Sequence, residues 1–214
     1  MISLSRRDAA EIADVLSDAF AEDPAFVALF RGLDKCGARS YRTFMQLWTR
    51  SAFHLGHSLY GVRTEGTLAG VVGVSHGTPK AIVGPIAELV HVPALLWGMR
   101  LSVGLSLARA VRRPAVVAKS AAEISMLAVR PSMQGRGIAA ALLSTAHGAL
   151  RVNEYNGPVY LYTTAQGSKT FYEKQGYKLV LATSAASVDV FHMLFAPDSG
   201  PNVHYGQEGQ NAPH

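Results

Sequence analysis

The sequence predicts one domain of the α/β (α+β) class, in which strands and helices share a core. Three patterns predict it: a strand–turn–helix unit over residues 122–150, a hairpin around Glu65-Gly66, and amphipathic helices within the first 53 residues. The chain has 214 residues, 49% of them hydrophobic, which suffices for one sizeable core. The domain is expected over residues 1–196. Residues 197–214 are polar and rich in Gly, Pro and Asn, which predicts a disordered tail.

The N-terminal half is expected to form a short strand, three helices and then the hairpin. Residues 1–4 can form the strand, and Ser5 to Asp8 match a capping box at the start of the first helix. Asp23-Pro24 places a capping side chain and a helix-compatible proline at the start of the second helix. Its buried side is expected to be Phe26, Val27 and Phe30. The third helix, about 39–53, carries an apolar stripe made of Tyr41, Phe44, Met45, Trp48 and Ala52.

The strand–turn–helix unit reads AEISMLAVRPSMQGRGIAAALLSTAHGAL. Its first eight residues alternate between two sets of side chains, and a period of two is typical of a strand. Arg130-Pro131 should end that strand, because proline has no N–H to donate to a sheet. After the glycines, apolar residues recur four apart, which predicts an amphipathic helix: Ile138, Leu142, Ala146 and Leu150, with Leu143 beside them.

The turn between strand and helix, Gly135-Arg136-Gly137, is a candidate anion site. The first N–H groups of a helix have no internal partner, and the helix dipole places partial positive charge there. Glycine lets a phosphate approach the backbone closely, and Arg136 adds a positive charge. The alternative is a plain turn in which glycine only supplies an unusual backbone angle. No Gly-Lys-Ser/Thr follows, so the turn is not a nucleotide P-loop, and Ala140 breaks the dinucleotide fingerprint.

This stretch resembles the acetyl-CoA-binding motif of the GNAT (Gcn5-related) superfamily of N-acetyltransferases. Gln134, Gly137 and Ala139 fill the defined places of the motif Gln/Arg-x-x-Gly-x-Gly/Ala, and Val129-Arg130-Pro131 fills its lead-in. A second segment typical of the family, FYEKQGY, follows at residues 171–177. The likeness covers roughly residues 1–195. It implies a mixed, mostly antiparallel sheet flanked by helices, with residues 77–119 as a helical insertion between the third and fourth strands.

The resemblance implies acetyl-CoA as co-substrate and a set of residues that contact it. Those residues are Leu127, Ala128, Val129, Gln134, Gly135, Arg136, Gly137, Ile138, Ala139, Ala140, Ser168 and Phe171. Many members of the family have an asparagine in the helix that carries Ser168, so here a shorter hydroxyl would replace the amide. By the same analogy the Leu127 N–H would meet the developing oxyanion, and the early helices would flank the acceptor pocket.

Two residues are implied to be catalytic. An alkylamine with a pKa near 10.4 arrives protonated at neutral pH, so a base must take a proton, and Glu123 stands where some members carry a general-base glutamate. Glu123 lies four residues before Leu127, which predicts one shared face and a gap of about 13 Å, so a water relay is expected. Tyr172 stands at the family's general-acid position, and we expect first a hydrogen bond to the leaving sulfur. The alternatives are a surface carboxylate and a packing tyrosine.

Composition narrows the function classes. The formal net charge is +5 and the pI about 9.5, which suits a polyanionic ligand such as coenzyme A. Lys and Arg are not interleaved with aromatics, so nucleic acid is not expected. The single cysteine and the lack of an apolar leader predict a cytoplasmic protein. His54 and His57 have helical spacing but no ligand companion, so no metal site is expected.

The insertion, residues 77–119, contains an apolar run that prolines and charged residues interrupt, so no membrane-spanning helix is expected. One or two amphipathic helices over the acceptor site are expected. A homodimer contact and a surface for a lipid-like substrate stay open.

The expected function is an acetyl-CoA-dependent N-acetyltransferase that acts on a primary amine of a small molecule, as drug-modifying members of the family do. The alternatives are a catalytically silent acyl-CoA-binding regulatory domain and a protein lysine or N-terminal acetyltransferase.

Overall fold

The computed structural model describes residues 1–30, 35–76 and 99–197 of the chain. The expected tail and the first part of the expected insertion therefore lie outside the described residues, apart from Pro197. The side chains of residues 35–37, which include Cys36, are not described either.

A seven-stranded sheet with strand order β1-β2-β3-β4-β5-β7-β6 forms the centre of the molecule. Every neighbouring pair is antiparallel except β4 and β5, which are parallel. The expected mixed, mostly antiparallel sheet is thus confirmed. The strands are β1 Ile2–Ser3, β2 Ser58–Thr64, β3 Thr67–Ser75, β4 Ala122–Val129, β5 Val159–Thr163, β6 Lys178–Ala185 and β7 Val188–Phe195.

Helices cover both faces of the sheet. The α-helices are α1 Ala9–Ala19, α2 Pro24–Leu29, α3 Lys35–His54, α5 Leu101–Ala110, α6 Ile138–Val152 and α7 Gln166–Lys174, and two 3-10 turns are η1 Arg6–Asp8 and η4 Pro131–Met133. One core cluster joins α1, α2, α3 and α5 to one face, around Ile12, Leu16 and Met126. A second joins α6 and α7 to the other face, around Leu142, Ile124 and Tyr172.

The sequence signals for the first two helices are realised with one exception. Ser5 and Asp8 form the expected capping box, with the Ser5 N–H donating to Asp8 Oδ2 at 2.8 Å. Asp23 caps α2 and accepts from the Ala25 N–H at 2.9 Å. The expectation that Val27 is buried was wrong: its side chain is 41% exposed, because α2 packs through Leu29 and Phe30 instead.

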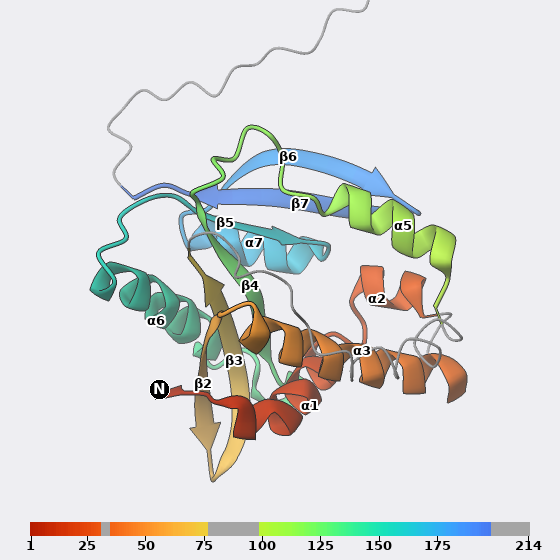
Figure 1. Cartoon of the computed structure of the whole chain (residues 1–214), viewed down its shortest axis with the longest axis horizontal. Coiled ribbons are helices and arrows are strands. Elements are labelled where there is room, and N and C mark those ends of the chain that lie inside the picture. Colours follow the sequence, from red (N-terminus) through yellow and green to blue (C-terminus); the bar gives the residue numbers. More distant parts are fainter. Residues whose placement is uncertain (31–34, 77–98, 198–214) are drawn as a thin grey trace, which may run out of the picture.

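The sheet divides after the first residues of β4 and β5. These strands pair only at Ala122–Val159 and Glu123–Tyr160, and beyond that point they separate. Figure 1 shows β2 and β3 running down the view while β5, β7 and β6 run across it. Because no strand of the described residues fills the widening gap, the edge of β4 beyond Glu123 is open toward β5.

A β-bulge sits in β4 at Ser125. Val74 of β3 pairs with Ile124 while the preceding Gly73 pairs with Met126, so Ser125 is an extra residue. An extra residue shifts the alternation by one position, so the side chains after the bulge face the opposite side of the sheet from the one that a regular strand would give them. Accordingly Ile124 packs in the cluster with α6, whereas Met126 packs in the cluster with α1 and α3.

Helix α5 lies between β3 and β4 in the chain, and it confirms a helical insertion at this place. Its C-terminus is fixed to the sheet, because His192 Nε2 of β7 lies 2.9 Å from the Ala110 carbonyl oxygen. Of the insertion that was expected to pack over the acceptor site, residues 77–98 lie outside the described residues, and α5 is the helix that the structure describes.

Candidate active site

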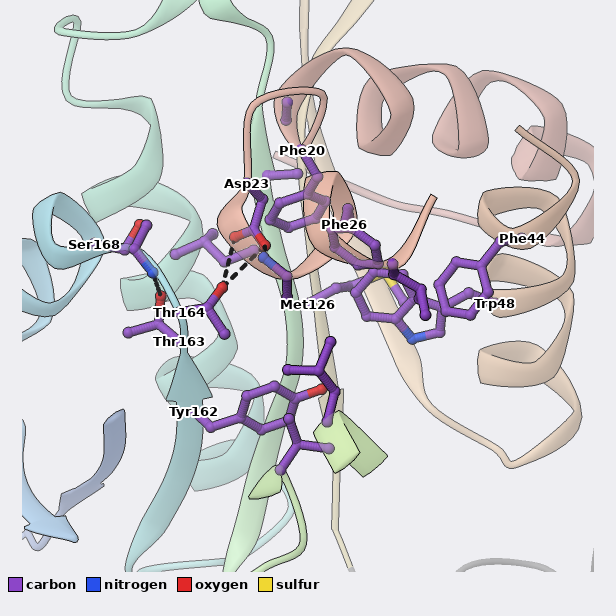
Figure 2. Close-up of a pocket in the computed structure, with 18 of the residues that line it drawn as sticks. Phe20, Asp23, Phe26, Phe44, Trp48, Met126, Tyr162, Thr163, Thr164 and Ser168 are labelled. Carbon is purple, nitrogen blue, oxygen red and sulfur yellow. Dashed lines mark hydrogen bonds between the residues drawn. The ribbon is translucent and has the colours of Figure 1, made fainter. Parts of the chain in front are cut away.

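A cavity of about 840 Å³ opens where β4 and β5 separate. Its walls come from the α1–α2 corner, α3, α5, β4 from Ile124 to Val129, the end of β5, and α7. Figure 2 shows the aromatic side chains of the early helices on one side and the strand with Thr163 and Thr164 on the other. One continuous cavity therefore reaches from the early helices through the gap in the sheet to α7.

The open edge of β4 presents backbone groups to this cavity. The Arg130 N–H donates to the Ala69 carbonyl on the β3 side at 2.9 Å. N–H groups point alternately to the two sides of a strand, so the Leu127 N–H points the other way, toward β5. Since β5 pairs with β4 only at Ala122 and Glu123, the Leu127 N–H has no strand partner among the residues that the structure describes, and Leu127 lines the cavity.

The glycine turn leads directly from β4 into α6. Gly135 and Gly137 have φ angles of 74° and 76°, the left-handed region that favours glycine, and Gly137 is the N-cap of α6. A Cβ added at either position would meet no atom within 4 Å, so the space above the turn is open. Within the described part of the chain, the backbone N–H groups of residues 135–140 have no hydrogen-bond acceptor.

Two side chains hold this turn in place. Gln134 Nε2 donates to the Val129 carbonyl at 3.0 Å, and this bond closes the turn back onto the end of β4. Arg130 forms an ion pair with Asp18 of α1 and donates through Nε to the Leu68 carbonyl at 2.9 Å. Arg136 is exposed, and Ile138, Ala139 and Ala140 are half-buried in the first turn of α6.

These features fit the diphosphate and pantetheine of acetyl-CoA. Free amides at a helix N-terminus and an exposed arginine bind phosphate, and an open strand edge can hydrogen-bond an extended chain. Of the remaining residues expected to bind the cofactor, Ala128, Val129 and Ser168 line the cavity. Phe171 does not; it packs against the core cluster around α6.

Tyr172 of α7 reaches the cavity from the other side of the gap. Its side chain is 8% exposed, and burial raises its pKa well above the usual value of 10.0. The ring packs against Phe171 and Tyr177. Its hydroxyl has no hydrogen-bond partner among the described residues, so it is free to donate to a ligand in the cavity.

Glu123 lies at the closed end of the gap and does not line the cavity. Its Oε2 accepts from Arg113 Nη2 at 2.8 Å, and Arg113 in turn lies over the Tyr160 ring. The expectation that Glu123 and Leu127 share a face was wrong, because the bulge at Ser125 lies between them. A role for Glu123 as general base stays a prediction.

Ser125 connects this region to the cavity. The Ser125 side chain lies in the cavity wall, with Oγ 3.0 Å from His57 Nδ1. Burial lowers the pKa of His57, while the nearby charge of Glu123 opposes that shift. The bulge thus places a hydroxyl, a neutral imidazole and a carboxylate next to one another beside the cavity.

Sequence reasoning missed Asp23 as a cavity residue. Its carboxylate accepts from the Ala25 N–H and from Thr164 Oγ1, which lies 2.9 Å from both carboxylate oxygens. Burial raises its pKa above the usual value of 3.8. The Asp-Pro pair was explained by helix capping alone, and only the Thr164 contact, which joins residues 141 positions apart, places the carboxylate in the cavity.

The aromatic stripe of α3 divides between the core and the cavity. Tyr41, Met45 and Ala52 are buried in the core, as expected. Phe44 and Trp48 line the cavity together with Phe20 and Phe26, and the four rings pack against one another with centroids 5.7 to 6.1 Å apart. These rings are the part of the early helices that a ligand can reach (Figure 2).

Within residues 1–30, 35–76 and 99–197, no three His, Cys, Asp or Glu residues come together as a metal site. Among the helices of the same ranges, none has the length and apolar character needed to span a membrane.

Comparisons with known proteins agree with this geometry. Residues 103–179 match the family model described as the acetyltransferase (GNAT) domain. The fold resembles a histone acetyltransferase HPA2 and related acetyltransferase from Corynebacterium glutamicum, with a TM-score of 0.65 and 18% identity over 94% of this chain and 97% of that chain. No curated protein sequence matches the chain.

Two further solved structures share the fold. The ribosomal-protein-S18-alanine N-acetyltransferase from Escherichia coli has a TM-score of 0.55 and 15% identity over 95% of this chain and 97% of its own. The yncA protein from Salmonella typhimurium, solved with its cofactor acetyl-CoA, has a TM-score of 0.54 and 13% identity over 96% and 97%. The likeness in fold thus extends over almost the whole chain, well beyond the segment that matches the family model.

Proposed function

We propose that this chain, which carries a GNAT acetyltransferase domain, is an acetyl-CoA-dependent N-acetyltransferase that acts on a primary amine of a small molecule. The observation that carries the proposal is the gap between β4 and β5. It joins an open strand edge and the free hydroxyl of Tyr172 in one cavity, and that cavity extends to Gln134, next to the helix N-terminus with unpaired amides. A regulatory domain that only binds acyl-CoA would need the turn but not the second compartment beyond the gap.

The cofactor would lie along the open edge of β4. The diphosphate is assigned to the amides of residues 135–140 and to Arg136, and the pantetheine to the backbone from Leu127 to Val129. This placement brings the thioester to the middle of the cavity, where the unpaired Leu127 N–H is available to the carbonyl oxygen.

In the transfer, the amine nitrogen forms a bond to the acetyl carbonyl carbon, the carbon–sulfur bond breaks, and coenzyme A leaves as a thiolate. The Leu127 N–H stabilises the negative charge that develops on the carbonyl oxygen, and the Tyr172 hydroxyl donates a hydrogen bond to the leaving sulfur. The nitrogen arrives as an ammonium and loses two protons, one before it attacks and one afterwards. We assign their route to solvent to Ser125 in the cavity wall, to His57, whose Nδ1 lies 3.0 Å from Ser125 Oγ, and to Glu123, whose charge acts on His57.

The cofactor site is tested by Gly137→Trp. The indole would occupy the open space above the turn, so we expect acetyl-CoA binding, measured by calorimetry, to fall at least tenfold, and thiol release with a panel of primary amines to fall with it. Gly66→Trp is the matched control, because Gly66 also has a positive φ and open space around its Cβ but lies in the β2–β3 turn. Equal effects of the two variants would show that strain, and not the lost site, lowers binding.

The same assay tests the reaction. Wild-type protein that binds acetyl-CoA but releases no thiol with any amine would contradict an enzyme and favour the regulatory alternative. Glu123→Gln, measured alongside, should slow turnover without weakening acetyl-CoA binding. An unchanged rate would remove Glu123 from the proton route.

A further inference from the structure

The cavity has a charge opposite to that of the whole protein. The chain has a formal net charge of +5. Yet the described residues that line the cavity include the carboxylates of Glu22 and Asp23 and no Lys, Arg or His. The positive groups near the cofactor site, such as Arg136, lie at the turn outside this lining. The acceptor compartment therefore has the electrostatic character of a cation site.

Asp23 is the carboxylate placed for that role. Its oxygens accept from a backbone N–H and a hydroxyl, both neutral donors, and no ion pair to Asp23 exists among the described residues. A largely buried carboxylate without a cation is costly. Capping α2 does not require the charge, because asparagine caps a helix as well as aspartate.

Glu123 does not compete for this role. It is neutralised by Arg113 at 2.8 Å, whereas Asp23 is not neutralised by any described side chain. Burial raises the pKa of Tyr162, whose ring lies in the cavity wall, and the charges of Glu123 and Asp23 raise it further. Of the two charges that act on this part of the cavity, the Asp23 charge is the one that a ligand would balance.

The wall next to Asp23 is aromatic. Phe20, Phe26 and Trp48 are half-buried, line the cavity and pack against one another, so part of each ring is available to a ligand in the cavity. Figure 2 places Asp23 between Phe20 and Thr164. Contact with such rings stabilises a bound flat apolar group. A bound cation is stabilised by cation–π attraction to the ring faces and by the charge of the carboxylate.

We propose that the acceptor is a cationic primary amine attached to an aromatic body, bound with its ammonium against Asp23 and its ring against Phe20, Phe26 and Trp48. This proposal rests on the proposed acetyl transfer, and it names the class of acceptor. Asp23 serves as the counter-ion that positions the ammonium. It is a far weaker base than an alkylamine, so the two protons that the ammonium nitrogen loses on becoming an amide leave by another route.

The test separates the two parts of the ligand. Calorimetry on the full chain with bound coenzyme A would measure three probes: 2-phenylethylamine, 2-phenylethanol without the charge, and ethanolamine without the ring. We expect 2-phenylethylamine to bind at least tenfold more tightly than either. In Asp23→Asn the cap and the Thr164 contact remain possible, and we expect the advantage over 2-phenylethanol to disappear. Asp14→Asn is the control, because Asp14 is an exposed carboxylate on α1 outside the cavity.

Each other outcome overturns the acceptor class. Equal binding of 2-phenylethylamine by Asp23→Asn and wild type would remove the counter-ion, and equal binding of ethanolamine and 2-phenylethylamine would remove the aromatic contact. Binding of none of the probes while coenzyme A binds would also refute the class. Coenzyme A binding and thiol release with other amines are read separately, so acetylation of an unrelated amine would refute the acceptor class and leave the proposed function standing.

Discussion

Tyr172 is too weak an acid to serve chiefly as a proton source. A coenzyme A thiolate that resembles cysteine has a pKa near 8.5, and burial holds the pKa of Tyr172 well above 10. Complete proton transfer from the phenol to the thiolate is therefore uphill. A hydrogen bond to the sulfur has no such cost, and it strengthens as negative charge develops on the leaving atom.

Tyr172→Phe should accordingly lower kcat by about 10- to 100-fold, because the lost hydrogen bond acts mainly in the transition state. The KM for acetyl-CoA should change less than about threefold, since the ring contacts with Phe171 and Tyr177 are retained. Steady-state kinetics with saturating amine would measure both. An unaltered kcat would mean that the hydroxyl does not reach the sulfur.

Asp23 and Glu123 show what sequence could and could not give at the residue scale. The geometry of the glycine turn depends on its own residues, so the motif was enough to predict it. Gly135 and Gly137 both have positive φ angles. The environment of a carboxylate depends on distant partners. Thr164 brings Asp23 into the cavity wall, and Arg113 of the insertion neutralises Glu123. Neither contact has a signature in local spacing.

At the scale of single elements, β4 follows closely from its period-two pattern, because the eight alternating residues at the start of the strand–turn–helix unit are the observed strand Ala122–Val129. The bulge in β4 could not be predicted in this way. The sequence EISML is compatible both with a regular strand and with a strand that contains a bulge. The bulge is set by the pairing with Gly73 and Val74 of β3, which this segment alone does not reveal. As a result the strand was predicted correctly while the faces of Glu123 and Leu127 were not.

One buried side chain, His192, ties the C-terminus of helix α5 to the sheet beside the cavity. His192 is fully buried; its Nε2–H donates to the Ala110 carbonyl at 2.9 Å, and its Nδ1 accepts from the Tyr160 hydroxyl at 2.7 Å. This pattern fixes a neutral imidazole with its proton on Nε2. Since α5 supplies part of the acceptor wall and none of the cofactor turn, His192 is a positioning residue for the acceptor side alone.

His192→Phe should therefore raise the KM for the amine several-fold and leave the KM for acetyl-CoA nearly unchanged. It also leaves a buried carbonyl and a buried hydroxyl without partners, which should lower the free energy of unfolding by about 1–3 kcal/mol. His192→Gln can restore a donor and an acceptor, so it should recover part of both losses. A parallel rise of both KM values would indicate a general loss of structure.

At the scale of the whole molecule, the fold separates a positive turn from the acidic end of one cavity. The sequence indicated a basic protein suited to a polyanion, and the glycine turn of α6 provides that site. The structure adds two carboxylates, Glu22 and Asp23, where the early helices line the cavity. An anionic cofactor and a cationic acceptor can thus approach from different sides, each attracted by the compartment it occupies.

Three histidines connect the stability of the whole fold to pH. Burial lowers the pKa of His57, His147 and His192 below the usual value of 6.5. They lie in separate parts of the molecule: His57 follows α3, His147 is in α6, where Nε2 is 3.0 Å from the Tyr177 hydroxyl, and His192 is in β7. Protonating any of them therefore acts on a different region of the core.

The sign of the pH effect follows from linkage. Between the lowered folded pKa values and about 6.5, the unfolded chain binds more protons than the folded one, so the free energy of unfolding rises with pH. The stabilising contribution is complete above about pH 6.5 and is lost as the pH falls below it. Urea unfolding at pH 8, 6.5 and 5 should show a clear decrease only between the last two. His147→Gln, which can still bond the Tyr177 hydroxyl, should make that decrease shallower. If wild type and variant have the same slope, His147 does not titrate differently in the folded and unfolded states.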